Sequence, residues 1–441
     1  SKPRYLRGCR FDIGGYRVSG TDVKGVIRIG LDDTDHIDCA CTTEHFQRLL
    51  TRLNDSIVSF ETKERRLVRL WPFAPNRTRG NAALAAICLV NIADLNNVDS
   101  ICKEFMDDLN KEIQGTYPDT GQKPSPCLLI ALDDYPESWY WEAVRGEVSL
   151  KVRKKQIPDS TKIYSIEHNP NGVVGASSAI AWNPNEHNTW ELIAWRSDDK
   201  ISSPREVSSQ AIESMSENFP TTFANRDPTT GRGMIMPRTN CPVLYGIRAE
   251  SFEELQSAHE FLQIREDVEK CYSWAIHRTN QISDDHLLGS EIGIVSSFPL
   301  EVQGGHSSVS VWTGSSSITL VAFAESGDVN ALLRRLKPGD EVEWMGLSSP
   351  SSEVHLERLR VNTSSPRLGK RPECCNKTMR SAGVGQGLRC KTCGHSIEKA
   401  WQTKSESFNS QHQGWVEPNT ANRRHLAKPL QRGLPTENNQ T

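Results

Sequence analysis

Three carboxylates at the end of an apolar segment are the first residues in this chain whose spacing suggests chemistry. Asp32, Asp33 and Asp35 follow residues 26–31, VIRIGL, a run of apolar and β-branched side chains that only Arg28 interrupts with charge. Carboxylates at positions i, i+1 and i+3 leave a strand in different directions, so two or three of them can share one cation. Hard oxygen ligands of this kind suit Mg²⁺ bridged to a nucleotide.

Two hydroxyls follow the carboxylates and lead into a helical pattern. Thr42 and Thr43 directly precede residues 46–53, whose apolar side chains recur with the period of a helix. A strand, an acidic turn and a helix in this order commonly hold a metal ion near phosphates. The alternative is a charged turn that caps the helix, with Thr42 or Thr43 as the N-cap. This segment alone leaves both interpretations open.

The loop NRTRGN at residues 76–81 is a second candidate for phosphate binding. Arg77 and Arg79 flank a hydroxyl, and Gly80 allows close approach of the backbone. A triphosphate or an RNA phosphate would suit this loop, and a solvated connection between strands is the alternative. The sequence has no GxxxxGK[ST] string and is therefore no P-loop protein. It also lacks the glycine-rich loop, HRD and DFG strings of protein kinases.

Four clustered cysteines predict a structural zinc site. Cys390 and Cys393 form a CxxC knuckle, whereas Cys374 and Cys375 are adjacent. Adjacent cysteines rarely both point at one ion, so His395 is an alternative fourth ligand. Four protein ligands leave no open coordination position, and zinc catalysis is therefore not expected.

Length and charge indicate a multidomain protein with a basic C-terminal end. The chain has 441 residues, 36% of them hydrophobic and 24% charged, which suits about three or four domains. Residues 361–432 carry 13 Lys and Arg against 4 Asp and Glu, a balance of +9, which leaves −12 for the remainder. Such segregation is expected when the basic end follows a polyanion; a disordered basic tail without a partner is the alternative.

The same data favour a cytoplasmic protein. No apolar run approaches the roughly 18 to 20 residues of a membrane span. The start, SKPRYLRGCR, has no apolar core and is not expected to be a secretory signal. Cysteines in CC and CxxC patterns indicate metal binding in a reducing compartment rather than a disulfide scaffold.

The patterns predict a mixed α/β and all-β chain. Residues 26–150 read as α/β, with strands at 26–31, 67–70, 82–90 and 127–132 and helices near 43–53 and 98–113. A second α/β region at 160–283 contains the small-residue segment NGVVGA, a strand at 189–195, and a turn, strand and exposed arginine at 240–248. A helix with Ser251 as N-cap follows. Strand, helix and strand suggest a ferredoxin-like module. Tyr245 and Arg248 are candidate ligand contacts there, with core packing and a surface arginine as the alternatives.

Residues 291–361 have the pattern of an OB-fold. Short strands are expected at 292–295, 302, 309–312, 318–323, 342–345 and 354–359, with a helix at 329–336 before the turn KPGD. An OB-fold is a small barrel that often binds single-stranded nucleic acid. A barrel that serves only as a spacer is the alternative.

Taken together, these strings resemble the archaeal tRNA-Ile 2-agmatinylcytidine synthetase family. The similarity covers nearly all of the chain after Gly25 and rests on GLDDTD and CTT, then NRTRGN, NGVVGA, NCPVLYGIR, VQGGH, SAGVGQGLRCKTC and NRRHLAKPL, in that order. It implies the following modules: an N-terminal extension (1–25), a kinase-like ATP-binding domain (26–155), a ferredoxin-like agmatine-binding domain (156–288), an OB-fold (289–365), a zinc ribbon (366–400) and a basic tail (401–441).

The resemblance also implies a reaction. The family is a group of ATP-dependent ligases that join agmatine to C2 of the wobble cytidine of tRNA-Ile with a CAU anticodon. The cytidine is phosphorylated first, and the product reads AUA. The implied partners are this tRNA and agmatine, with no membrane and no obligate protein partner. The alternative is a non-catalytic nucleic-acid-binding protein in which the N-terminal domain is degenerate.

The resemblance assigns expected roles to particular residues. Asp32, Asp33 and Asp35 would hold Mg²⁺ and ATP, and Thr42 matches the threonine that the family autophosphorylates. Phosphate contacts are expected at Thr34, Thr43, Arg77, Arg79, Gly80 and Asn81. The agmatine region is expected at Cys241, Pro242, Tyr245 and Gly246. Contacts with tRNA are expected at Arg248, Arg423, Arg424 and Lys428. Structural zinc is expected at Cys374, Cys375, Cys390 and Cys393.

Overall fold

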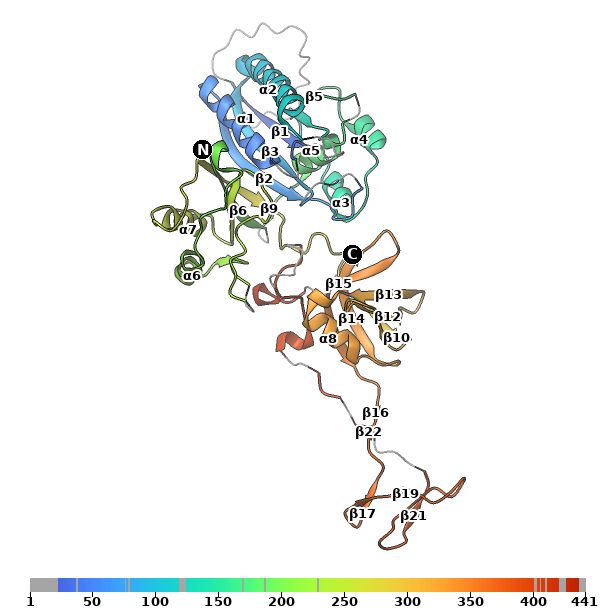
Figure 1. Ribbon diagram of the computed structural model, residues 1–441. Coiled ribbons are helices and arrows are strands. Elements are labelled where there is room, and N and C mark those ends of the chain that lie inside the picture. Colours follow the sequence, from blue (N-terminus) through green and yellow to red (C-terminus); the bar gives the residue numbers. More distant parts are fainter. Residues whose placement is uncertain are drawn as a thin grey trace, which may run out of the picture. The chain divides into compact units, whose positions relative to one another are not determined.

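The computed structural model of the chain divides into two compact units (Figure 1). The first comprises residues 1–286 with 424–428, and the second comprises residues 287–423 with 429–441. The structure describes residues 23–36, 39–75, 77, 80–118, 124–168, 170–185, 188–227, 230–399, 403–404, 406–408, 411–419 and 426–435. Arg79, Arg423, Arg424 and most of the expected N-terminal extension lie outside the described residues.

The first unit is built on one mixed sheet that spans both α/β regions of the sequence. In sheet order its strands are β5 (Lys162–Ser165), β4 (Cys127–Ala131), β1 (Lys24–Asp32), β3 (Ala82–Asn91), β2 (Glu61–Arg69), β9 (Ser273–Thr279), β6 (Thr189–Trp195), β8 (Val243–Ala249) and β7 (Thr222–Phe223). The two groups of strands join where β2 and β9 pair in parallel, with Arg66 opposite Arg278. The other neighbouring pairs of this sheet are antiparallel.

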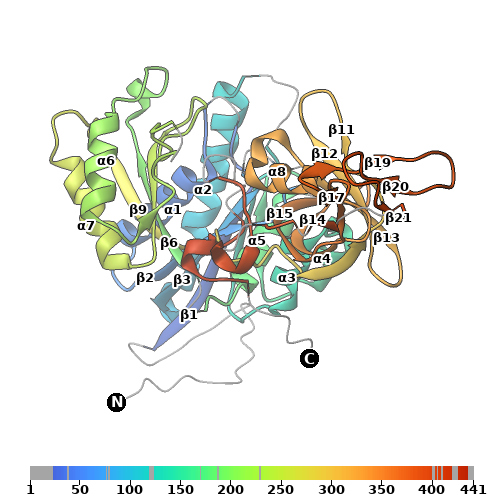
Figure 2. The same cartoon turned by 90° about the horizontal axis from the view of Figure 1, so that it is seen from below.

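Helices cover both faces of this sheet. They are α1 (Thr42–Ser56), α2 (Leu95–Thr116), α3 (Ser138–Arg145), α4 (Leu150–Gln156), α5 (Gly172–Ala181), α6 (Ser209–Asn218) and α7 (Phe252–Gln263). The apolar faces of α1 and α2 pack on β1 and β3, and α3 and α5 pack on the opposite face of these strands. Helices α6 and α7 pack on β6 and β8. Figure 2 shows β6 and β9 between α7 on one side and α1 on the other.

The alternation of β1 decides which side chains reach the candidate site. Ile27, Ile29 and Leu31 are buried against α1, as the period of two in a strand requires. Gly30 and Asp32 therefore point to the other face, where α5 lies. Helix α7 begins as expected, because the hydroxyl of Ser251 accepts a hydrogen bond from the backbone N–H of Glu254.

Acid is expected to destabilise the first unit through three buried histidines. Burial lowers the pKa of His259 and of His286 to about 4 and that of His277 to about 3. The unfolded chain binds protons below about pH 6.5 while the folded chain does not. The stability that these histidines contribute is therefore complete above pH 6.5 and is lost as the pH falls, at about 1.4 kcal/mol per pH unit for each histidine. Urea unfolding at pH 7 and pH 5 should show a smaller loss for His277→Phe than for the unsubstituted chain; equal losses would contradict this linkage.

The second unit contains a closed β-barrel. Its strands are β10 (Glu291–Val295), β11 (Leu300–Glu301), β12 (Ser307–Trp312), β13 (Ser317–Ala322), β14 (Glu341–Ser348) and β15 (Glu353–Thr363). They run in the order β10-β14-β15-β13-β12-β11, and the pairing of β10 with β12 closes the barrel. Helix α8 (Asp328–Arg335) packs Val329 and Leu333 into a core that includes Trp344. The interposed helix and the expected short strands are thus present, except that the strand expected at 302 lies at Leu300–Glu301.

Beyond the barrel the second unit forms small hairpins. These are β16 (Arg367–Leu368) with β22 (Thr403–Lys404), β17 (Glu373–Cys374) with β18 (Lys377–Thr378), and β19 (Arg380–Ser381) with β20 (Leu388–Arg389) and β21 (Ser396–Ile397). Short 3-10 turns occur at Ile92–Asp94, Asp198–Lys200, Ala324–Ser326, Gln411–Gly414 and Leu430–Arg432. Within the described part of the chain, every helix is too short or too polar to cross a membrane.

Candidate functional site

The acidic turn at the end of β1 presents its carboxylates to two different sides. Asp32 lies on the sheet face that α5 covers, and a Cβ at Gly175 would lie 1.8 Å from its Oδ2. Asp33 has a φ of 59°, an uncommon value for a residue other than glycine, and turns the chain. Asp35 accepts a hydrogen bond from the hydroxyl of Thr42 at 3.4 Å. The turn therefore places three carboxylates along the chain between the strand β1 and the start of α1, with Asp32 toward α5 and Asp35 toward α1.

Helix α5 approaches β1 closely because small residues line the contact. A Cβ at Gly30 would lie 2.6 Å from the carbonyl oxygen of Ala176, so only glycine fits there without displacement. Ser125 fixes the start of the helix: its Oγ accepts a hydrogen bond from the N–H of Asn171, and its carbonyl accepts one from Gly172. The positive end of the helix dipole thus lies beside the carboxylates, where it favours anions. The sequence suggested only a small-residue segment here.

Burial and mutual repulsion make the carboxylates hard to ionise together. Burial, followed by the charge of Asp33, raises the pKa of Asp32 well above its usual value. Burial and the neighbouring Asp35 raise the pKa of Asp33 to about 7, although a backbone hydrogen bond from Ser125 opposes this. Full ionisation near neutral pH is therefore costly unless a cation compensates the charge.

The start of α1 brings two hydroxyls to this turn. The N-cap of the helix is Cys41, whose side chain makes no capping hydrogen bond, so the alternative in which Thr42 or Thr43 is the N-cap is wrong. Both threonines lie within the first turn and bind other groups instead. Thr42 contacts Asp35, and the Oγ1 of Thr43 accepts a hydrogen bond from the Trp195 indole N–H at 3.2 Å. Thr34 is fully buried within the turn itself.

The arginine loop is only partly described, and a different arginine lies near the turn. Arg77 is exposed and donates to the carbonyl oxygen of Ala74 at 3.1 Å. Asn81 has a φ of 41° and binds the carbonyl oxygen of Trp71. The Gly80 carbonyl accepts a hydrogen bond from Arg69 at the end of β2.

Arg69 is a site residue that the sequence analysis missed. Burial lowers its pKa, which the charges of Glu191, Cys41 and Asp35 oppose. Its Nη2 lies 4.0 Å from Glu191 Oε2. The one sequence signal for Arg69 was its position in the strand predicted at residues 67–70, directly before the arginine loop.

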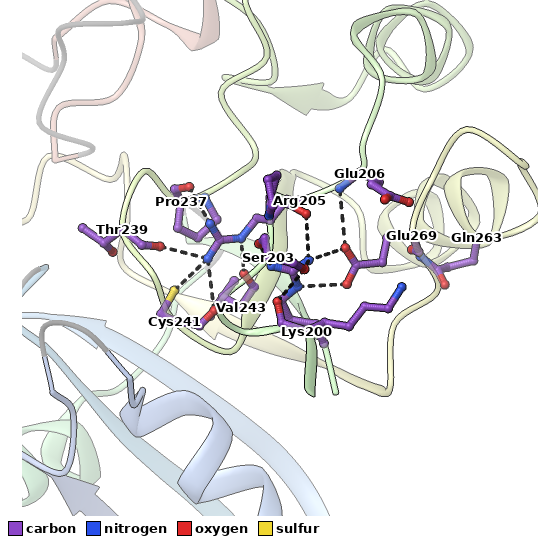
Figure 3. Close-up of polar contacts among 12 residues, drawn as sticks. Lys200, Ser203, Arg205, Glu206, Pro237, Thr239, Cys241, Val243, Gln263 and Glu269 are labelled. Atoms are coloured by element: carbon purple, nitrogen blue, oxygen red, sulfur yellow. Dashed lines mark hydrogen bonds and ion pairs between the residues drawn. The ribbon is translucent and has the colours of Figure 1, made fainter. Parts of the chain in front are cut away.

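The loop before β8 is held by one arginine (Figure 3). Arg205 donates to the carbonyl oxygens of Pro237, Thr239, Cys241 and Val243 at 2.8 to 3.1 Å and to the Cys241 sulfur at 3.3 Å. The backbone N–H of Arg196 donates to the carbonyl oxygen of Pro242. This places the expected agmatine residues Cys241 and Pro242 in a fixed, buried segment. No local sequence signal linked Arg205 to a loop more than 30 positions away.

The remaining expected residues of β8 lie on two faces of the sheet. Tyr245 is fully buried in the core under α7, where its hydroxyl hydrogen-bonds with His259 Nδ1 at 2.9 Å. Tyr245 therefore packs in the core, which was the alternative to a ligand contact. Gly246 lies on the opposite face, where an added Cβ would be 3.1 Å from Glu191 Oε1.

Arg248 is not the exposed arginine that the sequence predicted. Its side chain is 11% exposed, and its Nη2 lies 2.8 Å from Glu191 Oε1. The Nε donates to Gln281, whose amide donates to the other oxygen of Glu191. The expectation of exposure is wrong because the buried carboxylate of Glu191 on β6 requires a cationic partner.

Residues 426–428 of the tail belong to the first unit, whereas its other described residues belong to the second. Leu426 and Ala427 are buried, and the Leu426 carbonyl accepts a hydrogen bond from the N–H of Asp284. The N–H of Lys428 donates to the Asp284 carboxylate at 2.6 Å. Residues 426–428 are therefore ordered against the first unit.

Four cysteines converge in the hairpins of the second unit. The Sγ atoms of Cys374, Cys375, Cys390 and Cys393 all lie within 4.8 Å of one another. The four cysteines expected to bind zinc are thus brought together, and the alternative with His395 as the fourth ligand is not needed. Cys375 and Asn376 have φ values of 53° and 56° in the tight turn after Cys374. Backbone N–H groups of Cys393 and Thr392 lower the pKa of Cys390 to about 6, which favours the thiolate that zinc binds.

Comparison with known proteins matches these features to one family. Family models described as the TiaS TCKD domain, the TiaS FLD domain and the TiaS C-terminal zinc ribbon domain match residues 28–167, 171–286 and 371–406. The tRNA-Ile 2-agmatinylcytidine synthetase TiaS of Methanosarcina acetivorans is 32% identical over 92% of this chain and 97% of its own. The protein of the same name from Staphylothermus marinus is 30% identical over 92% and 94%.

Solved structures give the same answer. The crystal structure of a TiaS complex with its isoleucine tRNA and ATP superposes with a TM-score of 0.80 at 27% identity, and it covers 92% of this chain and 97% of that one. A complex of TiaS with the same tRNA, AMPCPP and agmatine gives 0.77 at 25% identity, with the same coverage. With relatives of at least 30% identity along nearly its whole length, this chain belongs to the TiaS family.

Proposed function

We propose that this chain is an ATP-dependent ligase that joins agmatine to C2 of the wobble cytidine of tRNA-Ile with a CAU anticodon. The observation that carries the proposal is the half-buried acidic turn, which lies between the threonines of α1 and the start of α5. Relatives that match more than nine-tenths of this chain are named for this activity. The structures of related proteins contain an isoleucine tRNA, ATP and agmatine.

The reaction divides into two steps. A phosphoryl group from ATP is transferred to the C2 oxygen of cytidine, because that oxygen alone is a poor leaving group. The primary amine of agmatine then attacks C2, the C2–O bond breaks, phosphate leaves and the amine loses a proton. Positioning and charge neutralisation are the main needs of phosphoryl transfer.

Thr42 is the proposed acceptor in an autophosphorylation step. Its hydroxyl already donates a hydrogen bond to Asp35, which is in place to take the proton as the oxygen attacks phosphorus. Thr43, Arg77, Arg79, Gly80 and Asn81 remain the proposed phosphate-contacting set, and Arg69 is added to it. Thr34 leaves the set because its side chain is fully buried and its hydroxyl is hydrogen-bonded to His45. Agmatine is proposed to bind near Cys241, Pro242 and Gly246, whereas the basic tail and the ribbon contact tRNA. Arg248 is no longer proposed as a tRNA contact, because it is paired with Glu191.

The acidic turn fits a Mg²⁺ ion. Its donors are carboxylate oxygens, and the raised pKa of Asp32 and of Asp33 reflects buried, mutually repelling charge that a cation would stabilise. Asp32, Asp33 and Asp35 would hold the ion, which would neutralise charge on the transferred phosphoryl group when bound. The four cysteines fit structural zinc in the same way.

The expected modules are proposed with the boundaries stated above. The strands of residues 26–155 and α1 form the kinase-like part, and β6, β8, β9, α6 and α7 form the ferredoxin-like part. The closed barrel is the proposed OB-fold. A non-catalytic nucleic-acid-binding protein would need none of the buried carboxylates, and that alternative is not favoured.

The chain should therefore add agmatine to tRNA in vitro. Incubation with ATP, Mg²⁺, agmatine and the tRNA transcript is expected to give the mass gain of agmatine at the wobble cytidine. Asp33→Ala should reduce the rate by about 100-fold or more, as expected for loss of a ligand to the ion that would neutralise charge in the transition state. No mass gain with the unsubstituted chain, or full activity of Asp33→Ala, would contradict the proposal.

Thr42 is tested separately with ATP labelled in its phosphates. Thr42→Ala is expected to abolish labelling of the protein. Thr51→Ala changes an exposed threonine on the same helix and should label normally. Equal labelling of the two variants would remove Thr42 from the mechanism.

A further inference from the structure

Thr34 lies between Asp33 and Asp35 in the acidic turn. It is hydrogen-bonded to one residue of α1 and to the residue that follows α2. Its side chain is 0% exposed. Its Oγ1 is hydrogen-bonded to His45 Nδ1 at 2.8 Å, and its carbonyl oxygen accepts a hydrogen bond from the Tyr117 hydroxyl at 3.2 Å. His45 lies on α1, and Tyr117 directly follows α2. The hydroxyl and the carbonyl of Thr34 are thus both fixed from outside the turn.

His45 and Tyr117 belong to one network of polar contacts. The hydroxyl of Tyr117 lies 3.4 Å from His45 Nε2, and Glu112 Oε1 lies 3.5 Å from the same nitrogen. Arg48 donates to the other oxygen of Glu112 at 2.8 Å. Hydrogen bonds from His45 and Arg48 lower the pKa of Glu112 to about 2, so it remains a carboxylate. The set ties α1 and α2 to each other and to the turn.

Thr34 separates Asp33 from Asp35, and these two carboxylates lie in different surroundings. Asp33 is held at a positive φ and lies near Ser125 and Glu167, whereas Asp35 faces Thr42. A rotation of the backbone at Thr34 would swing Asp33 and Asp35 relative to each other. A bound cation requires its oxygen ligands at fixed separations, and Mg²⁺ tolerates little deviation from octahedral geometry.

We propose that His45 and Tyr117 are positioning residues that set the geometry of the acidic turn for Mg²⁺–ATP. The inference rests on the proposed function of the turn. Neither residue needs to touch substrate; each acts through Thr34. Removing a hydrogen-bond partner that orients metal ligands typically lowers metal affinity by about 10- to 100-fold. The same loss is expected here, with little effect on agmatine.

Two substitutions separate this role from plain support of the core. Tyr117→Phe keeps the ring and removes only the hydroxyl that binds Thr34. His45→Leu removes the hydrogen bond to Thr34, and His45→Asn restores a polar atom close to the position of Nδ1. Tyr164→Phe is the matched control, because the Tyr164 hydroxyl binds Asp99 of α2 rather than a residue of the turn.

Calorimetric titration with Mg²⁺ and ATP measures the effect without catalysis. Tyr117→Phe and His45→Leu are expected to weaken Mg²⁺–ATP binding by about tenfold. His45→Asn should recover part of the loss, and Tyr164→Phe should bind normally. In activity assays the Mg²⁺ concentration for half-maximal rate should rise, while the KM for agmatine stays within about twofold. Unchanged Mg²⁺–ATP binding by Tyr117→Phe would overturn the proposal.

The outcomes distinguish this inference from the proposed function. If the unsubstituted chain binds Mg²⁺–ATP but does not modify tRNA, the proposed function is contradicted. The titration with the variants still decides whether His45 and Tyr117 are positioning residues. An active chain whose variants bind Mg²⁺–ATP normally would contradict the positioning role alone. Should His45→Leu fail to fold, which circular dichroism will reveal, Tyr117→Phe still decides the question.

Discussion

Gly175→Ala is expected to reduce tRNA modification by at least about 100-fold while the protein remains folded. The added Cβ would lie 1.8 Å from Asp32 Oδ2 and 2.6 Å from its Cγ, far inside van der Waals contact. Because Asp32 lies half-buried at the end of a central strand, its carboxylate has to move or rotate away from its present position. A displacement of about 1 Å at a reacting centre is enough for a 100-fold loss of rate.

Gly115→Ala provides the matched control for this prediction. Gly115 lies in the last turns of α2 with no atom within 4 Å of an added Cβ. Alanine there should leave activity unchanged and stabilise the helix by up to about 1 kcal/mol. Rates of agmatine incorporation and melting temperatures of both variants check the prediction. A Gly175→Ala protein with the activity of the unsubstituted chain would show that Asp32 does not need its present position.

Much of the first unit was predictable because its elements carry ordinary periodic signals. The strand before Asp32 and the helix after Thr43 follow from alternation and from a spacing of three to four residues. The strand predicted at 189–195 is confirmed as β6 (Thr189–Trp195). Its apolar residues are buried on both faces of the sheet, and such a strand appears in the sequence as a nearly continuous apolar run. The acidic turn was identified from residue types alone.

Helix α5 could not be predicted, although it completes the site. Residues 172–181 are buried on nearly every side, so they carry no polar face from which a helical period could be recognised. Its contact with β1 depends on glycines at positions 30 and 175, which are far apart in sequence. Arg69 and Arg205 were missed for a similar reason, since their partners Glu191 and Cys241 are distant along the chain.

Loss of any one cysteine of the ribbon is expected to release zinc, and Cys375→Ser is the most informative case. The sequence predicted zinc at all four cysteines, with His395 as an alternative to one of the adjacent pair. The structure gathers all four sulfurs within 4.8 Å and uses positive φ values at Cys375 and Asn376 to do so. Structural zinc binding contributes on the order of 10 kcal/mol to small domains, so removal of one thiolate should weaken affinity by about 100-fold or more.

His395→Ala is the variant that separates the two assignments. Its imidazole should be dispensable, because His395 takes part in the ribbon through its backbone carbonyl, which accepts a hydrogen bond from the N–H of Cys390. We expect full zinc content for His395→Ala by elemental analysis, and loss of zinc and of tRNA affinity for Cys375→Ser. Binding of Mg²⁺ and ATP should be unchanged in both, because the acidic turn lies in the first unit and the ribbon in the second. Zinc retained in Cys375→Ser but lost in His395→Ala would restore the assignment in which the histidine is the fourth ligand.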